Sequence, residues 1–137
     1  MAYLLDTNVI SEPMRARPDM RIVAWLNGLE NAHISALTLG EIRKGIEGAI
    51  DAKRKNRLES WLENQLIARF ETRIHHIDAV VADRWGRIVA NTPRPLPVMD
   101  SLFAATALTH DLILATRNVR DFADIAGLRL YDPWSDD

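Results

Sequence analysis

The chain contains no cysteine, which excludes disulfide bonds, thiol catalysis and zinc–thiolate sites. It has no apolar run approaching the ~18 residues of a membrane span, and its first residues lack the basic start and long apolar core of a signal peptide. It also lacks an excess of positive charge, because 17 Lys and Arg stand against 19 Asp and Glu. We therefore expect a soluble cytoplasmic protein that does not bind nucleic acid by bulk charge, although a local basic patch remains open.

The sequence also lacks the motifs of two further classes of site. Neither G-x-G-x-x-G nor G-x-x-x-x-G-K-[ST] occurs, so readings that need a nucleotide cofactor lose their main support. The acidic segment 6–8 lacks the second Asp expected of an aspartyl-phosphate phosphatase. Among the histidines, His75 and His76 are neighbours that would point to opposite faces of a strand, and His33 and His110 stand alone. We expect packing or solvation rather than metal ligation for all four.

The chain has the length and composition of one domain, spanning residues 1–137. Its 47% apolar and 26% charged residues are close to globular averages, and a chain of this size can fold without a metal or disulfide staple. Short apolar runs alternate with longer helical patterns, which predicts a parallel α/β sheet covered on both faces. The expected strands are 3–5, 32–35, 74–76, 112–115 and 128–131; the expected helices lie near 19–29, 37–49, 53–70, 78–90 and 100–109.

Three carboxylates are predicted to meet at one edge of this sheet. Asp6 follows the first strand, and Asp121 lies shortly after the strand at 112–115. Asp100 follows the proline-rich connector 91–97, at the expected start of a helix. In open α/β sheets, ligands bind beyond the carboxyl ends of the strands. Each acid has a simpler alternative, since Asp6 and Asp100 could cap helices and Asp121 could be a solvated loop residue.

Glu41 is the fourth candidate. On a helix it shares one face with Gly45 and Gly48, and two interior glycines on that face suggest that something packs closely there. The alternative is an exposed Glu on an amphipathic helix. Four converging acids without paired cations would repel one another and raise at least one pKa, and they would bind a hard divalent cation such as Mg²⁺ or Mn²⁺. Such a site is typical of metal-dependent phosphodiester hydrolysis.

Polar side chains next to these acids are expected to support the site. Thr7, Thr116 and Asn118 could donate hydrogen bonds to the carboxylates or to the scissile phosphate. A separate basic cluster, residues 53–57, contains Lys53, Arg54, Lys55 and Arg57. It could be a solvated surface or a contact for the RNA backbone, and both readings stay open because phosphate contact needs only clustered charge.

Four segments in order resemble the motifs of PIN-domain ribonucleases, above all toxins of the VapC and FitB type from bacterial toxin–antitoxin pairs. They are residues 4–12 (Leu-Leu-Asp-Thr-Asn-Val-Ile-Ser-Glu), 39–46, 100–107 and 115–122. The tail 131–134 is also similar to FitB. The resemblance covers nearly the whole chain. It implies a three-layer α/β/α fold with a central parallel sheet, and metal binding at Asp6, Glu41, Asp100 and Asp121, with Thr116 and Asn118 as polar site residues.

The resemblance further implies a homodimer and a small antitoxin that inserts a peptide, with a basic side chain, into the acidic pocket. Two functions remain open at this point. The first is an Mg²⁺-dependent endoribonuclease toxin. The second is a non-catalytic PIN-like module that acts mainly through its antitoxin, in a complex on promoter DNA. Retention of all four acids favours the enzyme.

Overall fold

The computed structural model describes residues 1–135 and has five short parallel strands at its centre. The strands are β1 (Tyr3–Leu5), β2 (Ala32–Ser35), β3 (Ile74–His75), β4 (Ile113–Ala115) and β5 (Leu130–Tyr131). Their order across the sheet is β3-β2-β1-β4-β5. The chain therefore builds outward from β1 on one side and then crosses back to β4 on the other. Because of this reversal, the adjacent strands β1 and β4 form the topological switch point. Open α/β sheets bind their ligands beyond the carboxyl ends of the strands at such a point.

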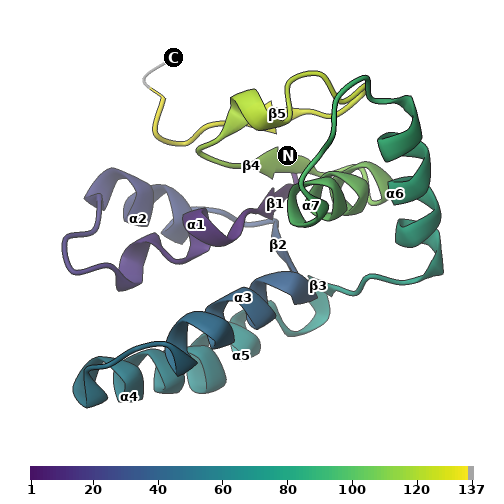
Figure 1. Cartoon of the computed structure of the whole chain (residues 1–137). Helices are drawn as coiled ribbons and strands as arrows, with labels where there is room; N and C mark the ends of the chain where they lie inside the picture. The colour runs from purple at the N-terminus through teal and green to yellow at the C-terminus, as the bar shows by residue number, and fades with distance from the viewer. Residues whose placement is uncertain (136–137) are drawn as a thin grey trace.

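Helices cover both faces of the sheet (Figure 1). The first group is α1 (Thr7–Ile10), α2 (Met20–Asn27), α3 (Ala36–Glu47), α4 (Ala52–Trp61) and α5 (Ile67–Phe70). The second group is α6 (Ala79–Asn91) and α7 (Val98–Thr109), which pack closely against each other. Single turns at Glu12–Met14, Glu71–Arg73 and Val119–Asp121 (η1, η3 and η4) complete the connections. The predicted three-layer α/β/α fold is confirmed.

Alternation along the strands separates two hydrophobic cores. Tyr3 and Leu5 face the core under α1–α5, whereas Leu4 between them faces the core under α6 and α7. In β4, Ile113 and Ala115 face the first core and Leu114 the second. Because neighbouring residues of a strand point to opposite faces, three apolar residues in a row are all buried here. The expected strands were therefore placed correctly, although β3, β4 and β5 are shorter than predicted.

The helix predicted at 53–70 is not one regular helix. A π-helical turn, Leu62–Leu66, joins α4 to α5. Leu62, Leu66 and Phe70 are almost fully buried and recur every four residues. On an α-helix a four-residue step overshoots a full turn by about 40°, so such a stripe would drift away from the core. The wider π turn takes up this drift and keeps the three side chains on the sheet.

The helix predicted at 100–109 starts earlier, at Val98, with Pro97 as its N-cap residue. Asp100 therefore lies inside the first turn, and the capping alternative for this residue is wrong. The reason is that a proline disfavours helical backbone only for the residues before it, so Val98 and Met99 are free to form the first turn. The connector before it is extended as expected. Within the described part of the chain, no helix is long and apolar enough to cross a membrane.

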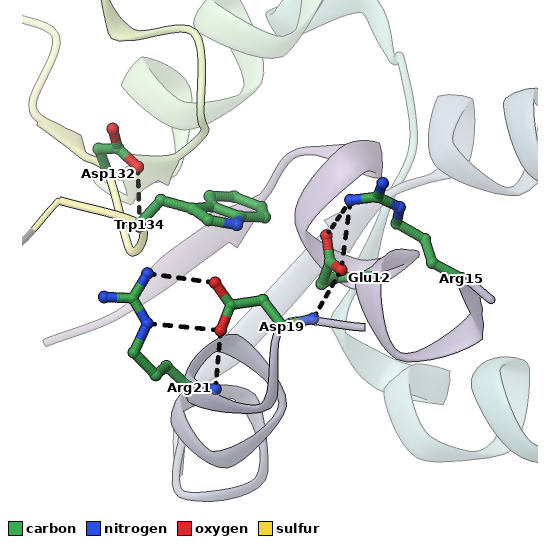
Figure 2. Close-up of polar contacts among 6 residues, drawn as sticks. All are labelled: Glu12, Arg15, Asp19, Arg21, Asp132 and Trp134. Carbon is green, nitrogen blue, oxygen red and sulfur yellow. Dashed lines mark hydrogen bonds and ion pairs between the residues drawn. The ribbon is translucent and has the colours of Figure 1, made fainter. Parts of the chain in front are cut away.

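A buried glutamate holds the loop between η1 and α2. Glu12 is 1% exposed, and its carboxylate accepts hydrogen bonds from Arg15 Nη1 at 3.0 Å and from the backbone N–H of Asp19 at 3.0 Å. Asp19 in turn caps α2 and pairs with Arg21 (Figure 2). Trp134 fixes the C-terminal segment nearby. Its backbone N–H donates to the carboxylate of Asp132, and its ring packs on the first core.

Candidate active site

Asp6 lies at the switch point between β1 and β4. Its N–H donates to the carbonyl of Ala115 at 2.9 Å, which fixes the residue to the end of β4. One carboxylate oxygen accepts from Thr7 N at 2.7 Å and so caps α1, and the other accepts from Thr116 Oγ1 at 2.8 Å. Asp6 is therefore both a helix cap and a member of the site. Among residues 1–135 no cation forms an ion pair with Asp6, and its partners there are a backbone N–H and a hydroxyl.

Thr7 connects Asp6 to Glu41, because its backbone N–H donates to Asp6 and its hydroxyl donates to Glu41. Thr7 Oγ1 donates to Glu41 Oε1 at 2.6 Å and lies 2.9 Å from Thr38 Oγ1. Since the Thr7 proton goes to Glu41, Thr38 is the donor in the second bond. On the other side, Thr116 accepts from the N–H of Asn118 at 3.1 Å. The predicted support from Thr7 and Thr116 thus has a geometric basis, whereas Asn118 contributes its backbone.

Asp100 joins Asp121 to the other acids, because Asp100 lies within electrostatic reach of Asp121, Glu41 and Asp6. Burial is the largest cause that raises the pKa of Asp6, and the charges of Glu41 and Asp100 add to it. Burial also raises the pKa of Asp100 most, followed by the charges of Asp121 and Glu41. The expected direction is confirmed for Asp6 and Asp100. The expected cause needs correction, because desolvation outweighs the crowding of charge.

The donor set fits a hard, hydrated cation. Across residues 1–135, no three His, Asp or Glu side chains converge closely enough to form a ready-made metal cage. Magnesium does not require one, since it dehydrates reluctantly and usually binds through one or two carboxylates while keeping several waters. Asp6 and Asp100 are carboxylates of this kind, because both are partly buried and neither has a cation paired to it among the described residues. Asp121 is exposed, as expected for an acid that acts through water.

The glycines beside Glu41 face open space rather than a tight contact. A side chain at Gly45 would meet nothing within 4 Å, and one at Gly48 only ordinary contacts. The prediction of close packing within this chain is therefore wrong. Instead the two glycines line a groove of about 570 Å³, together with Thr7, Glu41, Leu58 and Trp61.

One residue of the basic cluster, Arg54, lines the same groove. It also lines a neighbouring hollow of about 470 Å³ with Lys53 and Arg57. Lys53 and Arg57 are exposed, while Lys55 forms a long ion pair with Glu47 and Arg54 donates to the carbonyl of Met14. Arg54 thus shares one groove with Glu41, whereas Lys53 and Arg57 line the neighbouring hollow.

The histidines are arranged differently from the prediction. His33 and His110 are not isolated, because both contact His75. The His33 Nδ1 and His75 Nε2 atoms are 2.9 Å apart, and the centroids of the His75 and His110 rings are 4.1 Å apart. Burial, then the neighbouring His110 and His33, lowers the pKa of His75 to about 4. These residues come together because His33 and His75 lie on adjacent strands and point to the α7 face.

Two residues of the site carried no clear sequence signal. Thr38 is fully buried and holds Thr7, and its only signal was its position three residues before Glu41 on the same helix face. Arg94, in the proline-rich connector, reaches the turn that carries Asp121. No local pattern predicts that contact, because the partners are 27 residues apart in the chain.

Comparison with known proteins identifies the family. The PIN domain model matches residues 3–128. The chain is 41% identical to Toxin FitB of Neisseria gonorrhoeae, over 97% of this chain and 99% of that protein. It is 32% identical to the VapC ribonuclease Y4jK of Sinorhizobium fredii, over 96% of both. A solved structure of FitAB bound to the IR36 DNA fragment superposes with a TM-score of 0.89 and 36% identity, covering 98% of this chain and 97% of that one. The chain belongs to the PIN domain family.

Proposed function

We propose that this PIN domain is a Mg²⁺-dependent endoribonuclease that acts as the toxin of a toxin–antitoxin pair; Mn²⁺ would serve the same sites. The observation that carries the proposal is the position of Asp6 at the β1–β4 switch point, beside Glu41 and Asp100, with no cation paired to it among the described residues. Relatives named as a toxin and as a ribonuclease support it.

The residues of the chain would divide the work as follows. Asp6 and Asp100 would hold the metal, with Glu41 and Asp121 acting directly or through bound water. The cation would activate a water and stabilise charge on the phosphoryl group. Thr7 and Thr116 fix the orientation of Glu41 and Asp6, because each hydroxyl donates to one carboxylate. Lys53, Arg54 and Arg57 would contact the RNA backbone, since Arg54 shares a groove with Glu41 and a neighbouring hollow with Lys53 and Arg57.

The same groove is the proposed docking site of the antitoxin. Its apolar walls, Leu58 and Trp61 among them, suit an apolar peptide segment, and its acidic end at Glu41 suits a basic side chain. A peptide in this position would exclude RNA from the acids. The FitAB assembly on DNA supports a toxin–antitoxin complex that binds promoter DNA, and we propose a homodimer within it. A monomer mass at micromolar concentration by light scattering would contradict the dimer.

The test of catalysis is cleavage of an RNA panel with Mg²⁺, with Mn²⁺ and with excess EDTA. We expect cleavage only with metal, and none for Asp100→Asn. The matched control is Asp83→Asn, which removes an exposed carboxylate of α6 that pairs with Arg87 far from the acids. Full cleavage in EDTA would exclude the metal. No cleavage of any RNA by folded protein would favour the alternative function, a binding module that acts through antitoxin and promoter DNA.

The proposed RNA contact has its own test. Lys53→Ala with Arg57→Ala should weaken RNA binding about equally across sequences and reduce the log–log salt slope by roughly one to two. Arg84→Ala with Arg87→Ala removes the same charge from α6 and should leave the slope unchanged. An unchanged slope in the first variant would assign the basic cluster to the solvated surface.

A further inference from the structure

Arg94 links the proline-rich connector to the turn that carries Asp121. Its Nε and Nη2 atoms donate to the two carboxylate oxygens of Asp124, each at 2.8 Å, and Nη2 also donates to the backbone carbonyl of Asp121. In Figure 1 the connector between α6 and α7 runs beside the segment that follows β4. A two-pronged contact of this kind fixes direction as well as distance, because the guanidinium is planar.

The turn itself has little else to hold it. Within η4, the N–H of Asp121 donates to the carbonyl of Asn118 at 3.0 Å, and the N–H of Phe122 to that of Val119 at 3.2 Å. Phe122 is buried in the second core, but Asn118 and Asp121 are exposed. A single 3₁₀ turn with weak geometry does not determine where its last side chain points. A tether to the carbonyl of Asp121 fixes the peptide plane at that residue, and with it the direction in which the side chain leaves the backbone.

The backbone around Arg94 is conformationally restricted. Arg94 stands between Pro93 and Pro95, which fix their own backbone φ and restrict the residue before each of them. Little backbone entropy is therefore lost when Arg94 binds its partners. The hydrogen bond to Asp124 does most to raise the pKa of Arg94, and the charges of Asp124, Asp121 and Asp100 add to it. The connector leads directly into α7, which carries Asp100 in its first turn.

We propose that Arg94 is a positioning residue of the acid site, whose two-pronged contact with Asp124 and the Asp121 carbonyl holds the Asp121 carboxylate opposite Asp100. Its consequence for metal binding and cleavage rests on the proposed function. The positioning itself does not, because it is a property of the metal-free chain.

The chain provides a matched control. Arg129 Nη2 donates to the carbonyl of Asp111 at 3.0 Å and to its carboxylate at 2.9 Å, so it also joins one side chain to one backbone carbonyl. Asp111 precedes β4, at the end of the sheet opposite to the acids. Loss of this pair should affect its own loop only.

The first measurement is amide hydrogen exchange in metal-free protein. Arg94→Gln and Arg94→Lys should both speed exchange at residues 121 and 122 several-fold, because each variant loses the planar two-pronged contact with Asp124 and the Asp121 carbonyl. Arg129→Gln should leave these amides unchanged. Rescue by Arg94→Lys would overturn the proposal, because it would show that charge suffices without the planar contact. Unchanged exchange in Arg94→Gln would also overturn it.

The second measurement is calorimetric binding of Mn²⁺ alone. Arg94→Gln should weaken binding about 10- to 100-fold, as is usual for residues that orient a metal ligand, while Arg129→Gln binds as the parent does. A parent that binds no Mn²⁺ would contradict the proposed function and leave the exchange result to decide the positioning role. Should Arg94→Gln fail to fold, Asp124→Asn removes the partner instead. It should speed exchange at residue 121 by the same factor, and a lack of change would count against the proposal.

Discussion

Two carboxylates in the same opening motif have opposite surroundings. Glu12 is fully buried, yet it has a cation, Arg15, and a backbone N–H as partners. Asp6 is only partly buried, and it has hydroxyl and backbone donors but two further acids, Glu41 and Asp100, as charged neighbours. A buried charge with matched partners stabilises one conformation of a loop. A carboxylate without a cation, beside other acids, is arranged for a ligand that brings positive charge.

The largest expected difference between Asp6 and Glu12 is in the rate of RNA cleavage. Asp6→Asn should lower the rate of RNA cleavage by more than about 100-fold, because even outer partners of a metal site cost ~10–100-fold. Glu12→Gln should leave the rate per folded molecule within a few-fold of the parent. The measurement is single-turnover cleavage in Mg²⁺ at equal concentrations of folded protein. Equal losses in the two variants would show that the distinction between them is wrong.

The free energy of unfolding should show the opposite order, because Glu12→Gln should destabilise the protein and Asp6→Asn should not. In Glu12→Gln one carboxylate oxygen becomes an NH2 group, which is a hydrogen-bond donor. This group would face either Arg15 or the N–H of Asp19, which are donors themselves, so one of the two hydrogen bonds is lost. We expect the free energy of unfolding to fall by about 1–3 kcal/mol, which corresponds to several degrees in melting temperature. Urea unfolding of the metal-free protein measures this. Stability equal to that of the parent would mean that the Asp19 loop is held by other contacts.

Metal should stabilise the parent through Asp6 and not through Glu12. Mg²⁺ at about five times its dissociation constant should add roughly 1 kcal/mol, or ~3–5 °C in melting temperature. Glu12→Gln should show the same increment from its lower starting point, and Asp6→Asn a smaller one. Thermal scans at several Mg²⁺ concentrations give the comparison. An equal increment in Asp6→Asn would remove Asp6 from the set of metal ligands.

The smallest expected effect is the pH dependence without metal. Burial, with the charges of Glu41 and Asp100, raises the pKa of Asp6 above the usual 3.8 although Thr116 and Thr7 oppose this. The folded protein therefore binds this proton more tightly than the unfolded chain, and the ionised Asp6 destabilises it at neutral pH. Asp6→Asn should be slightly more stable than the parent at pH 7 in EDTA. Its advantage should shrink as the pH falls through the raised pKa and vanish near 3.8.

This last effect has an informative opposite outcome. Both carboxylate oxygens of Asp6 accept hydrogen bonds, whereas Asn has one oxygen, which can keep the cap on Thr7 N but leaves an NH2 group facing Thr116 Oγ1. If Asp6→Asn unfolds more easily than the parent at pH 7, loss of the Thr116 bond outweighs the cost of the buried charge. Urea unfolding from pH 7 to pH 3.5 distinguishes the two signs.

The amino-acid sequence by itself determined the sheet and the place of the acids along it. Three-residue apolar runs such as 3–5 are buried on both faces, and a polar residue directly after such a strand must lie at its carboxyl end. Asp6 and Thr116 could therefore be predicted to meet, and in the structure they are hydrogen-bonded. The helices were found within a few residues, because their apolar spacing is a local property.

Tertiary structure alone decided the contacts that join distant segments. The π turn at Leu62–Leu66 depends on how the stripe of Leu62, Leu66 and Phe70 meets the sheet. The contact of His33 with His75 depends on which strands are neighbours, and the tether from Arg94 to Asp121 depends on where the connector crosses the turn after β4. Local spacing fixes which face a side chain occupies. It does not fix what lies opposite that face, because the partner comes from another part of the chain and is chosen by packing of the whole sheet.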